Sequence, residues 1–209
     1  TLRYGCAATA VDTQARTVTL ADGNCLPFTN LVFATGSRPI RLPIPGMQLP
    51  GVVTFRDAGD VDSLTSLAGP GVRVTVIGGG LLGLEAAYGL AKTGASVTLL
   101  HLMDRLMERQ LDPHAADMLK SAVEAKGIRV LLQADTAQFT GTGRVEGVAL
   151  KDGRTVDADL VVVAVGIRPA AELATQAGIT VKRGIVVDDT LRTSVPGVYA
   201  LGECAEHRG

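Results

Sequence analysis

Three glycines, Gly78, Gly80 and Gly83, have the spacing that a bound pyrophosphate group requires. They follow the apolar run 74–77 and precede helix-forming residues, so the sequence predicts a buried strand, a tight turn and a helix. Gly78 permits the sharp turn, Gly80 leaves the backbone open to a phosphate, and Gly83 lets the helix pack close to the strand. The pattern predicts a turn that binds a dinucleotide.

The residues that follow the turn support this interpretation. The first free N–H groups of the helix, at Leu81 and Leu82, would point at an anion. Gly94 predicts the end of the helix, and residues 95–101 predict a second buried strand. The result is a complete βαβ unit of about 30 residues. A glycine turn without a ligand is the alternative, but it would not need glycine at all three offsets.

Two further helices are expected near this unit. Residues 57–68 predict a surface helix with Val61, Leu64 and Leu67 on one face. Residues 112–126 predict another helix, because an Asp-Pro pair at their start is typical of an N-cap and a first helical position.

Several strands are also predicted. Residues 128–132 form a third strand, and residues 134–157 alternate between short apolar segments and turns, as in a β-meander. Residues 159–165 carry charge at one end only, which is typical of a strand buried on both faces of a parallel sheet, and Gly166 follows in a second turn of close backbone approach. The predicted fold class is α/β, a Rossmann-like three-layer domain with an inserted β-meander.

The two ends of the chain predict shorter strands. A hairpin is expected at 7–20, and apolar strands at 31–34 and 198–201. The strand at 31–34 ends in small residues, Thr35 and Gly36, which either approach a ligand closely or form an ordinary turn.

Composition excludes several classes of function. The 209 residues carry a net charge of −1, which does not favour nucleic acid, and no apolar run is long enough to span a membrane. Cys6, Cys25 and Cys204 lie far apart, which argues against a disulfide framework, a zinc site and a redox dithiol and fits a reducing cytoplasm. We predict no metal site and no catalytic side chain.

Four stretches, 31–39, 78–86, 159–169 and 195–203, occur in the order found in flavoprotein pyridine-nucleotide reductases, which the chain resembles over essentially its whole length. In that family a nicotinamide domain is inserted into an FAD domain. The resemblance implies FAD contacts at the two outer strand ends, at Ala34, Thr35, Gly36, Gly202 and Glu203. Glu203 departs from the Asp usual at the position that takes a ribityl hydroxyl of FAD.

Two finer stretches, 106–112 and 200–209, resemble the large subunit of NAD(P)H-dependent nitrite reductases. This resemblance implies hydride transfer from NAD(P)H to FAD, followed by electron transfer to an iron–sulfur and sirohaem module elsewhere in the parent protein. Three cysteines are too few to ligate such a cluster within this chain. A rubredoxin or ferredoxin reductase, an NADH oxidase and a non-catalytic dinucleotide-binding module are the alternatives. A disulfide reductase is disfavoured because no cysteines are paired.

The resemblance also implies a division of the chain. We expect a partial FAD segment at 1–45, a connector and helix at 46–70, an NAD(P)-binding domain at 71–165 and a return to the FAD domain at 166–209. The family's first FAD motif would precede Thr1, so we expect a piece of a longer protein that is inactive and colourless in isolation.

Four polar residues are expected near the glycine turn, and three of them have two interpretations each. Glu85 is expected on the first helical turn, where it either lies near the nicotinamide, as in the family, or only interacts with the helix dipole. His101 ends the second strand, where NAD-specific domains carry an acidic residue that binds the ribose. A His at this position does not indicate whether the cofactor is NAD or NADP. Asp104 or Arg105 would reach the ribose from the loop, or both are surface charges.

Overall fold

Two compact units divide the chain in the computed structural model, which describes residues 2–208. The inserted unit spans Pro39–Gly166, and the split unit combines the residues up to Arg38 with those from Ile167 onward. The segment 46–70 therefore belongs to the same unit as the glycine turn. We describe each unit by itself.

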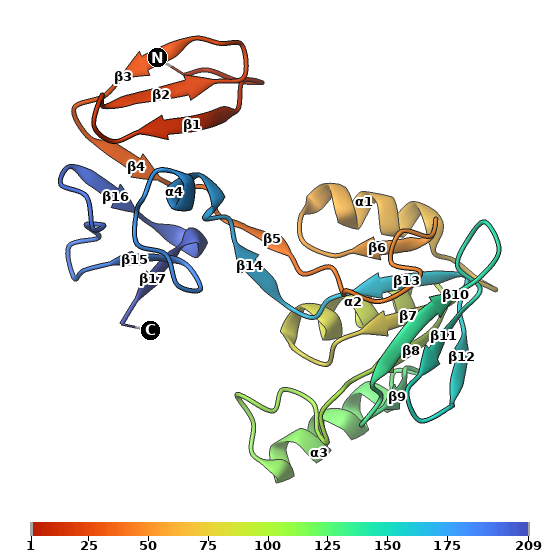
Figure 1. Ribbon diagram of the computed structural model, residues 1–209. Coiled ribbons are helices and arrows are strands. Elements are labelled where there is room, and N and C mark those ends of the chain that lie inside the picture. The colour runs from red at the N-terminus through yellow and green to blue at the C-terminus, as the bar shows by residue number, and fades with distance from the viewer. Residues whose placement is uncertain (1, 209) are drawn as a thin grey trace. The chain divides into compact units, whose positions relative to one another are not determined.

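A five-stranded parallel sheet forms the centre of the inserted unit, with strand order β6-β13-β7-β8-β9 (Figure 1). Its strands are β6 (Val52–Thr54), β7 (Arg73–Ile77), β8 (Ser96–Leu100), β9 (Arg129–Leu131) and β13 (Leu160–Val163). Every residue of β13 is buried, as its apolar sequence predicts for a strand covered on both faces.

Helices cover one face of this sheet. They are α1 (Ala58–Leu67), α2 (Leu81–Lys92) and α3 (Pro113–Glu124). Alternate strand residues, among them Val74, Val76 and Leu99, pack in one hydrophobic cluster with Ala86 and Leu90 of α2. This period of two places the remaining strand side chains on the opposite face.

The predicted β-meander covers that opposite face. It consists of β10 (Thr136–Thr140), β11 (Gly147–Leu150) and β12 (Thr155–Asp157), which pair antiparallel in sequence order. Ile77 and Leu100 of the parallel sheet cluster with Phe139 and Val148 of the meander. The α/β class and its three layers are confirmed, and the third layer is the meander.

The segment before the glycine turn contains the predicted surface helix and a strand that was not predicted. Little of the apolar face of the helix is covered, because only Leu64 is buried while Val61 and Leu67 are 41% and 53% exposed. The helix is held at its start by a capping box between Asp57 and Asp60. The sequence analysis missed β6, which lies at the edge of the sheet in a proline-rich and glycine-rich segment.

The split unit consists of short strands and one short helix. Three strands form an antiparallel sheet, β1 (Ala8–Asp12), β2 (Thr17–Leu20) and β3 (Cys25–Pro27), which extends the predicted hairpin by one strand. The other elements are β4 (Leu31–Phe33), β5 (Ser37–Pro39), β14 (Ile167–Pro169), α4 (Glu172–Gln176), β15 (Ile185–Val187), β16 (Val198–Ala200), η1 (Gly202–Cys204) and β17 (Ala205–His207). β4 pairs parallel with β16, and β15 pairs parallel with β17.

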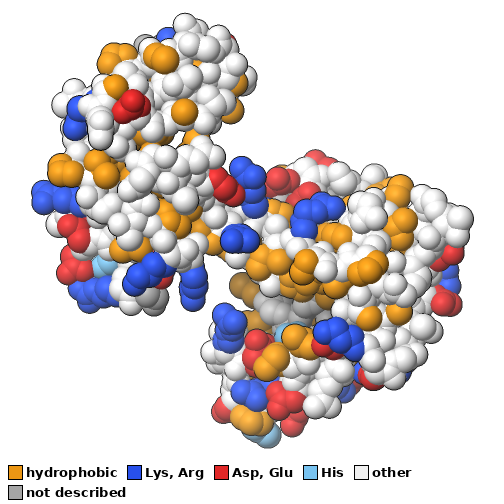
Figure 2. Space-filling model, viewed as in Figure 1, with side chains coloured by type: hydrophobic (Ala, Val, Ile, Leu, Met, Phe, Trp, Pro, Cys, Tyr) orange, Lys and Arg blue, Asp and Glu red, His pale blue; other side chains and the backbone are white. Residues whose placement is uncertain are grey.

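The surface carries charges of both signs. Figure 2 shows acidic and basic side chains interspersed on the face drawn, in keeping with the net charge of −1. None of the helices described within residues 2–208 has the length and apolar character needed to cross a membrane.

Candidate functional site

The glycine turn between β7 and α2 requires glycine for reasons that the structure makes explicit. Gly78 has a φ of 118°, and a Cβ there would overlap the carbonyl of Ala164. A Cβ on Gly83 would overlap the carbonyl oxygen of Gly78, so only glycine lets the helix pack this close to the turn. Both explanations agree with those expected for this spacing.

Gly80 differs from its two neighbours in the motif. Its backbone is extended, with a φ of −84°, and no atom lies within 4 Å of the place where its Cβ would be. Gly80 is also the N-cap of α2, and no side chain caps the helix there. The first N–H groups of an α-helix, here including those of Leu81 and Leu82, have no acceptor within the helix and are therefore available to an anion.

The turn lies at the switch point of the sheet. The chain leaves β7 towards β8 and β9 on one side, while β13 and β6 lie on the other. Ala164 to Gly166 leave the carboxyl end of β13 directly beside Gly78, and Gly166 itself is exposed with a φ of 113°. In open α/β sheets the crevice at such a point receives the ligand.

His101 lies immediately after β8 and is turned into the protein. It is 8% exposed, and the backbone N–H of Gly79 donates a hydrogen bond of 3.0 Å to its Nδ1. Its Nε2 lies 3.0 Å from Oε2 of Glu108. Both ring nitrogens are therefore engaged inside the protein, and any part that His101 plays in binding a ribose is indirect.

The sequence analysis missed Gly79 and Glu108. A Cβ on Gly79 would come within 2.6 Å of the Leu106 side chain and 2.7 Å of the His101 ring, so this position needs glycine as well. Glu108 lies in the stretch 106–112, which was matched to a family without any role for its residues. A His and a Glu seven residues apart in a loop have no periodicity that would reveal their contact.

Three charged residues lie near the turn, and one of them is not where it was expected. Placing Glu85 on the first turn of the helix is wrong: α2 begins at Leu81, so Glu85 is its fifth residue, and it is exposed. Asp104 is exposed, and Arg105 is partly buried with Nη1 3.2 Å from Asp104 Oδ1. Arg105 also donates from Nη2 to the carbonyl of Glu108, at 3.4 Å.

In the split unit, the parallel strands β4 and β16 bring the two predicted strand ends together. Val32 is paired with Tyr199 and Phe33 with Ala200, and the N–H of Leu201 donates to the carbonyl of Phe33. Ala34, Thr35 and Gly36 therefore lie beside Gly202 and Glu203. The hydroxyl of Ser37 donates to Oε2 of Glu203 at 2.8 Å, which holds the two strand ends together.

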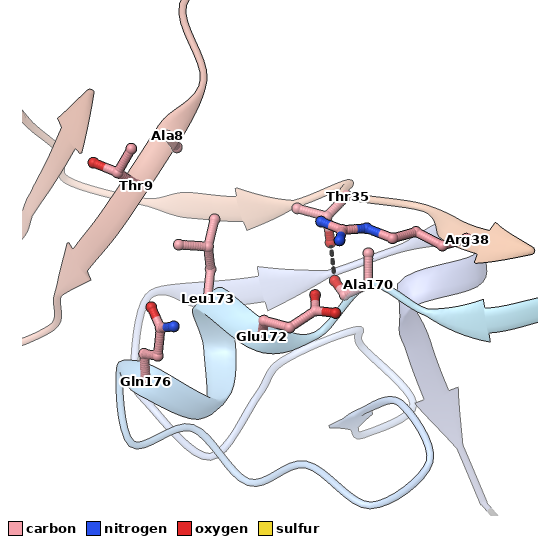
Figure 3. A pocket seen from close by; sticks show the side chains of 8 residues that line it. All are labelled: Ala8, Thr9, Thr35, Arg38, Ala170, Glu172, Leu173 and Gln176. Atoms are coloured by element: carbon pink, nitrogen blue, oxygen red, sulfur yellow. Dashed lines mark hydrogen bonds between the residues drawn. The ribbon is translucent and has the colours of Figure 1, made fainter. Parts of the chain in front are cut away.

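A cavity of about 430 Å³ lies next to Thr35 in the split unit. Figure 3 shows the Thr35 hydroxyl directed at the Ala170 carbonyl, to which it donates a hydrogen bond of 2.5 Å. The lining residues come from β1, from the segment after β4 and from the region of α4: Ala8, Thr9, Thr35, Arg38, Ala170, Glu172, Leu173 and Gln176. One cation and one carboxylate among them give the cavity a mixed electrostatic character.

The described residues do not form a metal site or a disulfide. No group of three or more His, Cys, Asp or Glu within residues 2–208 is arranged to hold a metal ion. Cys6, Cys25 and Cys204 are free thiols, and Cys204 is buried with its sulfur donating to the carbonyls of Phe33 and Leu201.

The inserted unit thus defines an α/β protein with a dinucleotide-type glycine turn at its switch point. Comparison with known proteins identifies the family: residues 1–209 match that of the pyridine nucleotide-disulphide oxidoreductases, and the chain belongs to it. Members of this family use FAD and NAD(P)H.

Two curated relatives come from Bacillus subtilis strain 168. Nitrite reductase [NAD(P)H] is 48% identical over 95% of this chain and 25% of its own length. The assimilatory nitrate reductase electron transfer subunit is 43% identical over all of this chain and 27% of its own length. The chain therefore spans about a quarter of the length of these two relatives.

A solved structure agrees closely with the fold. The ferredoxin reductase for the CYP199A2 system of Rhodopseudomonas palustris superposes with a TM-score of 0.92 at 33% identity, over 98% of this chain and 51% of that one. Similar relatives thus include proteins named for nitrite reduction and proteins named for ferredoxin reduction.

Proposed function

We propose that this chain is the nicotinamide-dinucleotide-binding part of a flavoprotein oxidoreductase. The observation that carries the proposal is the open space over Gly80 at the uncapped start of α2. The backbone of the turn and of the first helical residues would hold the pyrophosphate, namely Gly78, Gly80, Leu81, Leu82 and Gly83. Gly166 would border the crevice from the β13 side, and Arg105 would reach the ribose.

The strand ends of the split unit are proposed as the FAD contacts that this chain contributes. Ala34, Thr35 and Gly36 on one strand end and Gly202 and Glu203 on the other would approach the flavin nucleotide. We propose that FAD is contacted from the segments 1–45 and 166–209 and that 71–165 binds NAD(P). Residues 39–45, like the connector and helix at 46–70, belong to the inserted unit. NAD(P)H would supply a hydride and FAD would accept it, while the protein would hold the two in a fixed orientation.

FAD carries its own pyrophosphate, which requires a second glycine-rich turn. The described residues of the split unit contain no glycine-rich strand–turn–helix like that of residues 73–92. We therefore expect the 209-residue chain, purified alone, to contain no flavin and to show no NADH oxidation. Stoichiometric flavin absorbance in the purified chain would contradict this expectation.

For the parent protein we propose NAD(P)H-dependent nitrite reduction in the cytoplasm, with electrons passing to an iron–sulfur and sirohaem module outside this chain. The support is the 48% identity to a protein named nitrite reductase [NAD(P)H]. The test is to express the parent with the sequence that flanks these residues and measure NADH-dependent loss of nitrite. A preparation loaded with sirohaem that reduces dyes with NADH, but never nitrite, would exclude this substrate.

A ferredoxin or rubredoxin reductase, or an NADH oxidase, is the second candidate. The close superposition on a ferredoxin reductase favours it. The same parent preparation separates the two: NADH-dependent reduction of a ferredoxin with no nitrite turnover would support the second candidate. Binding of NADH with no reduction of any acceptor would indicate a non-catalytic module.

A further inference from the structure

We propose that His101 and Glu108 are a positioning pair that holds the glycine turn in the shape that binds a dinucleotide. This inference rests on the proposed function of the turn and adds two residues that act through its backbone. Gly79 donates its N–H to His101, and its carbonyl accepts a hydrogen bond of 3.0 Å from the N–H of Met107. Both polar groups of Gly79 are thus held by the loop at 101–108.

The hydrogen-bond partners select one form of the imidazole. A backbone N–H can only donate, so Nδ1 of His101 must be unprotonated to accept from Gly79. Nε2 then carries the proton and donates to the carboxylate of Glu108. Glu108 therefore fixes the tautomer that Gly79 requires. A second proton on the ring would place an N–H against the N–H of Gly79 and break the contact.

Packing makes the pair rigid. His101 is 8% exposed, and Leu106, which is fully buried, lies against Gly79. Backbone hydrogen bonds fix the position of His101 further, since its N–H donates to Leu131 and its carbonyl accepts from Ala134. The next residue after Gly79 is Gly80, whose open side is the proposed pyrophosphate site. Displacing Gly79 would therefore move the backbone groups that face the ligand.

The charged groups around the pair come from the same loop. Arg109 has its Nε 3.8 Å from Oε1 of Glu108, and Arg105 donates to the carbonyl of Glu108. Burial raises the pKa of Glu108, but hydrogen bonds from its own backbone N–H and from His101 more than offset this, and the pKa lies below the usual glutamate value. The carboxylate is thus ionised when it accepts from His101. The pair also connects the turn with the loop that carries Asp104 and Arg105.

Titration of the 209-residue chain with NADH tests this proposal. His101→Leu removes the acceptor for Gly79 and leaves its N–H unsatisfied, so NADH affinity should fall about tenfold or more at pH 7.5. His101→Asn keeps an oxygen near the position of Nδ1 and should recover affinity to within about threefold of wild type. His114→Leu, the same change on an exposed histidine of α3, is the matched control and should leave affinity unchanged.

Variants at Glu108 separate positioning from folding, because Glu108 acts on Gly79 only through His101. Glu108→Leu removes the acceptor of Nε2 and should lower NADH affinity, whereas Glu108→Gln keeps an oxygen that can accept from Nε2 and should bind to within about threefold of wild type. Circular dichroism restricts the comparison to folded protein. This pair of variants decides the question even if His101→Leu does not fold. Equal NADH affinity in wild type and folded Glu108→Leu would overturn the proposal.

Gly80→Val separates this proposal from the one on which it rests. Loss of NADH binding in Gly80→Val, with normal binding in the His101 and Glu108 variants, would reject the positioning pair alone. Normal binding in Gly80→Val would reject the dinucleotide site itself.

Discussion

The proposed cofactor site is more complete in the inserted unit than in the split unit. In the inserted unit, a contiguous strand–turn–helix supplies the glycines and free N–H groups, and the loop at 101–108 holds the turn in place. In the split unit, residues far apart in the sequence meet only because β4 and β16 pair. We propose that the first arrangement binds a ligand by itself and that the second supplies one side of a site. This difference is the reason to expect NADH binding without flavin in this chain.

The largest expected effect comes from the glycine that packs the helix against the turn. Gly83→Ala places a Cβ against the carbonyl of Gly78 and should reduce the free energy of unfolding by about 2–3 kcal/mol, with loss of NADH binding. Gly89→Ala, in the same helix but in open space, should instead stabilise the chain by about 0.5–1 kcal/mol. Urea unfolding measures both. Equal stabilities for the two variants would contradict the packing role of Gly83.

A smaller effect is expected at the opposite end of the strands, where Asp159 pairs with Arg73. Arg73 donates to both carboxylate oxygens from Nε and Nη2, at 3.0 and 2.7 Å. Asp159→Asn removes the charge that pairs with Arg73 and should reduce the free energy of unfolding by about 1 kcal/mol. The effect is this small because Arg73 is exposed, so that solvent screens the ion pair. NADH affinity should not change, since this end of the sheet is remote from the turn. A loss of affinity in a folded variant would show that binding depends on more than the turn.

The Asp159 carboxylate should also make the free energy of unfolding depend on pH. Hydrogen bonds from the Arg73 side chain lower the pKa of Asp159 from 3.8 to about 2. Because the pKa is lower in the folded state, the stabilisation is present in full above about pH 4 and is lost as the pH falls towards 2. The difference in stability between wild type and Asp159→Asn should shrink over this range. A difference that stays constant from pH 5 to pH 2 would exclude the ion pair as its source.

The smallest effect concerns the choice between NADH and NADPH. Asp104 is exposed and would repel a 2′-phosphate, whereas the neighbouring Arg105 would attract it and is already paired with Asp104. We expect NADH to bind more tightly, and Arg105→Ala to weaken NADPH binding about threefold. Competitive titration with the two cofactors measures this preference. Tighter binding of NADPH that is lost in Arg105→Ala would reverse it.

The regular parts of the fold could be predicted because local pattern and tertiary role agree in them. The apolar run of β13, the glycines around α2 and the turns of the meander each carry their own signal. β6 could not be predicted, because its three residues lie among prolines and glycines and depend on pairing with β13. How little of α1 is buried could not be predicted, because its apolar spacing does not show how much of the helix the sheet covers.

Of the candidate site, only the backbone of the glycine turn could be predicted from the sequence. Glycine offsets identify where a ligand's pyrophosphate fits, since the requirement is steric and local. The direction of the His101 side chain depends on how residues 102–108 fold back over the turn, which has no periodic pattern. The approach of Ser37 to Glu203 likewise depends on two strands that are far apart in the sequence.

Titration of NADH into wild type and Gly80→Val tests the central claim most directly. The backbone of Gly80 is extended and its Cβ would meet open space, so the variant should fold, while the valine side chain should occupy the pyrophosphate position. Gly69→Val, also a change into open space in the same unit, is the matched control. We predict that Gly80→Val loses at least about 100-fold in affinity while Gly69→Val binds as wild type does. Equal affinity for NADH in wild type and folded Gly80→Val would contradict a dinucleotide site at this turn.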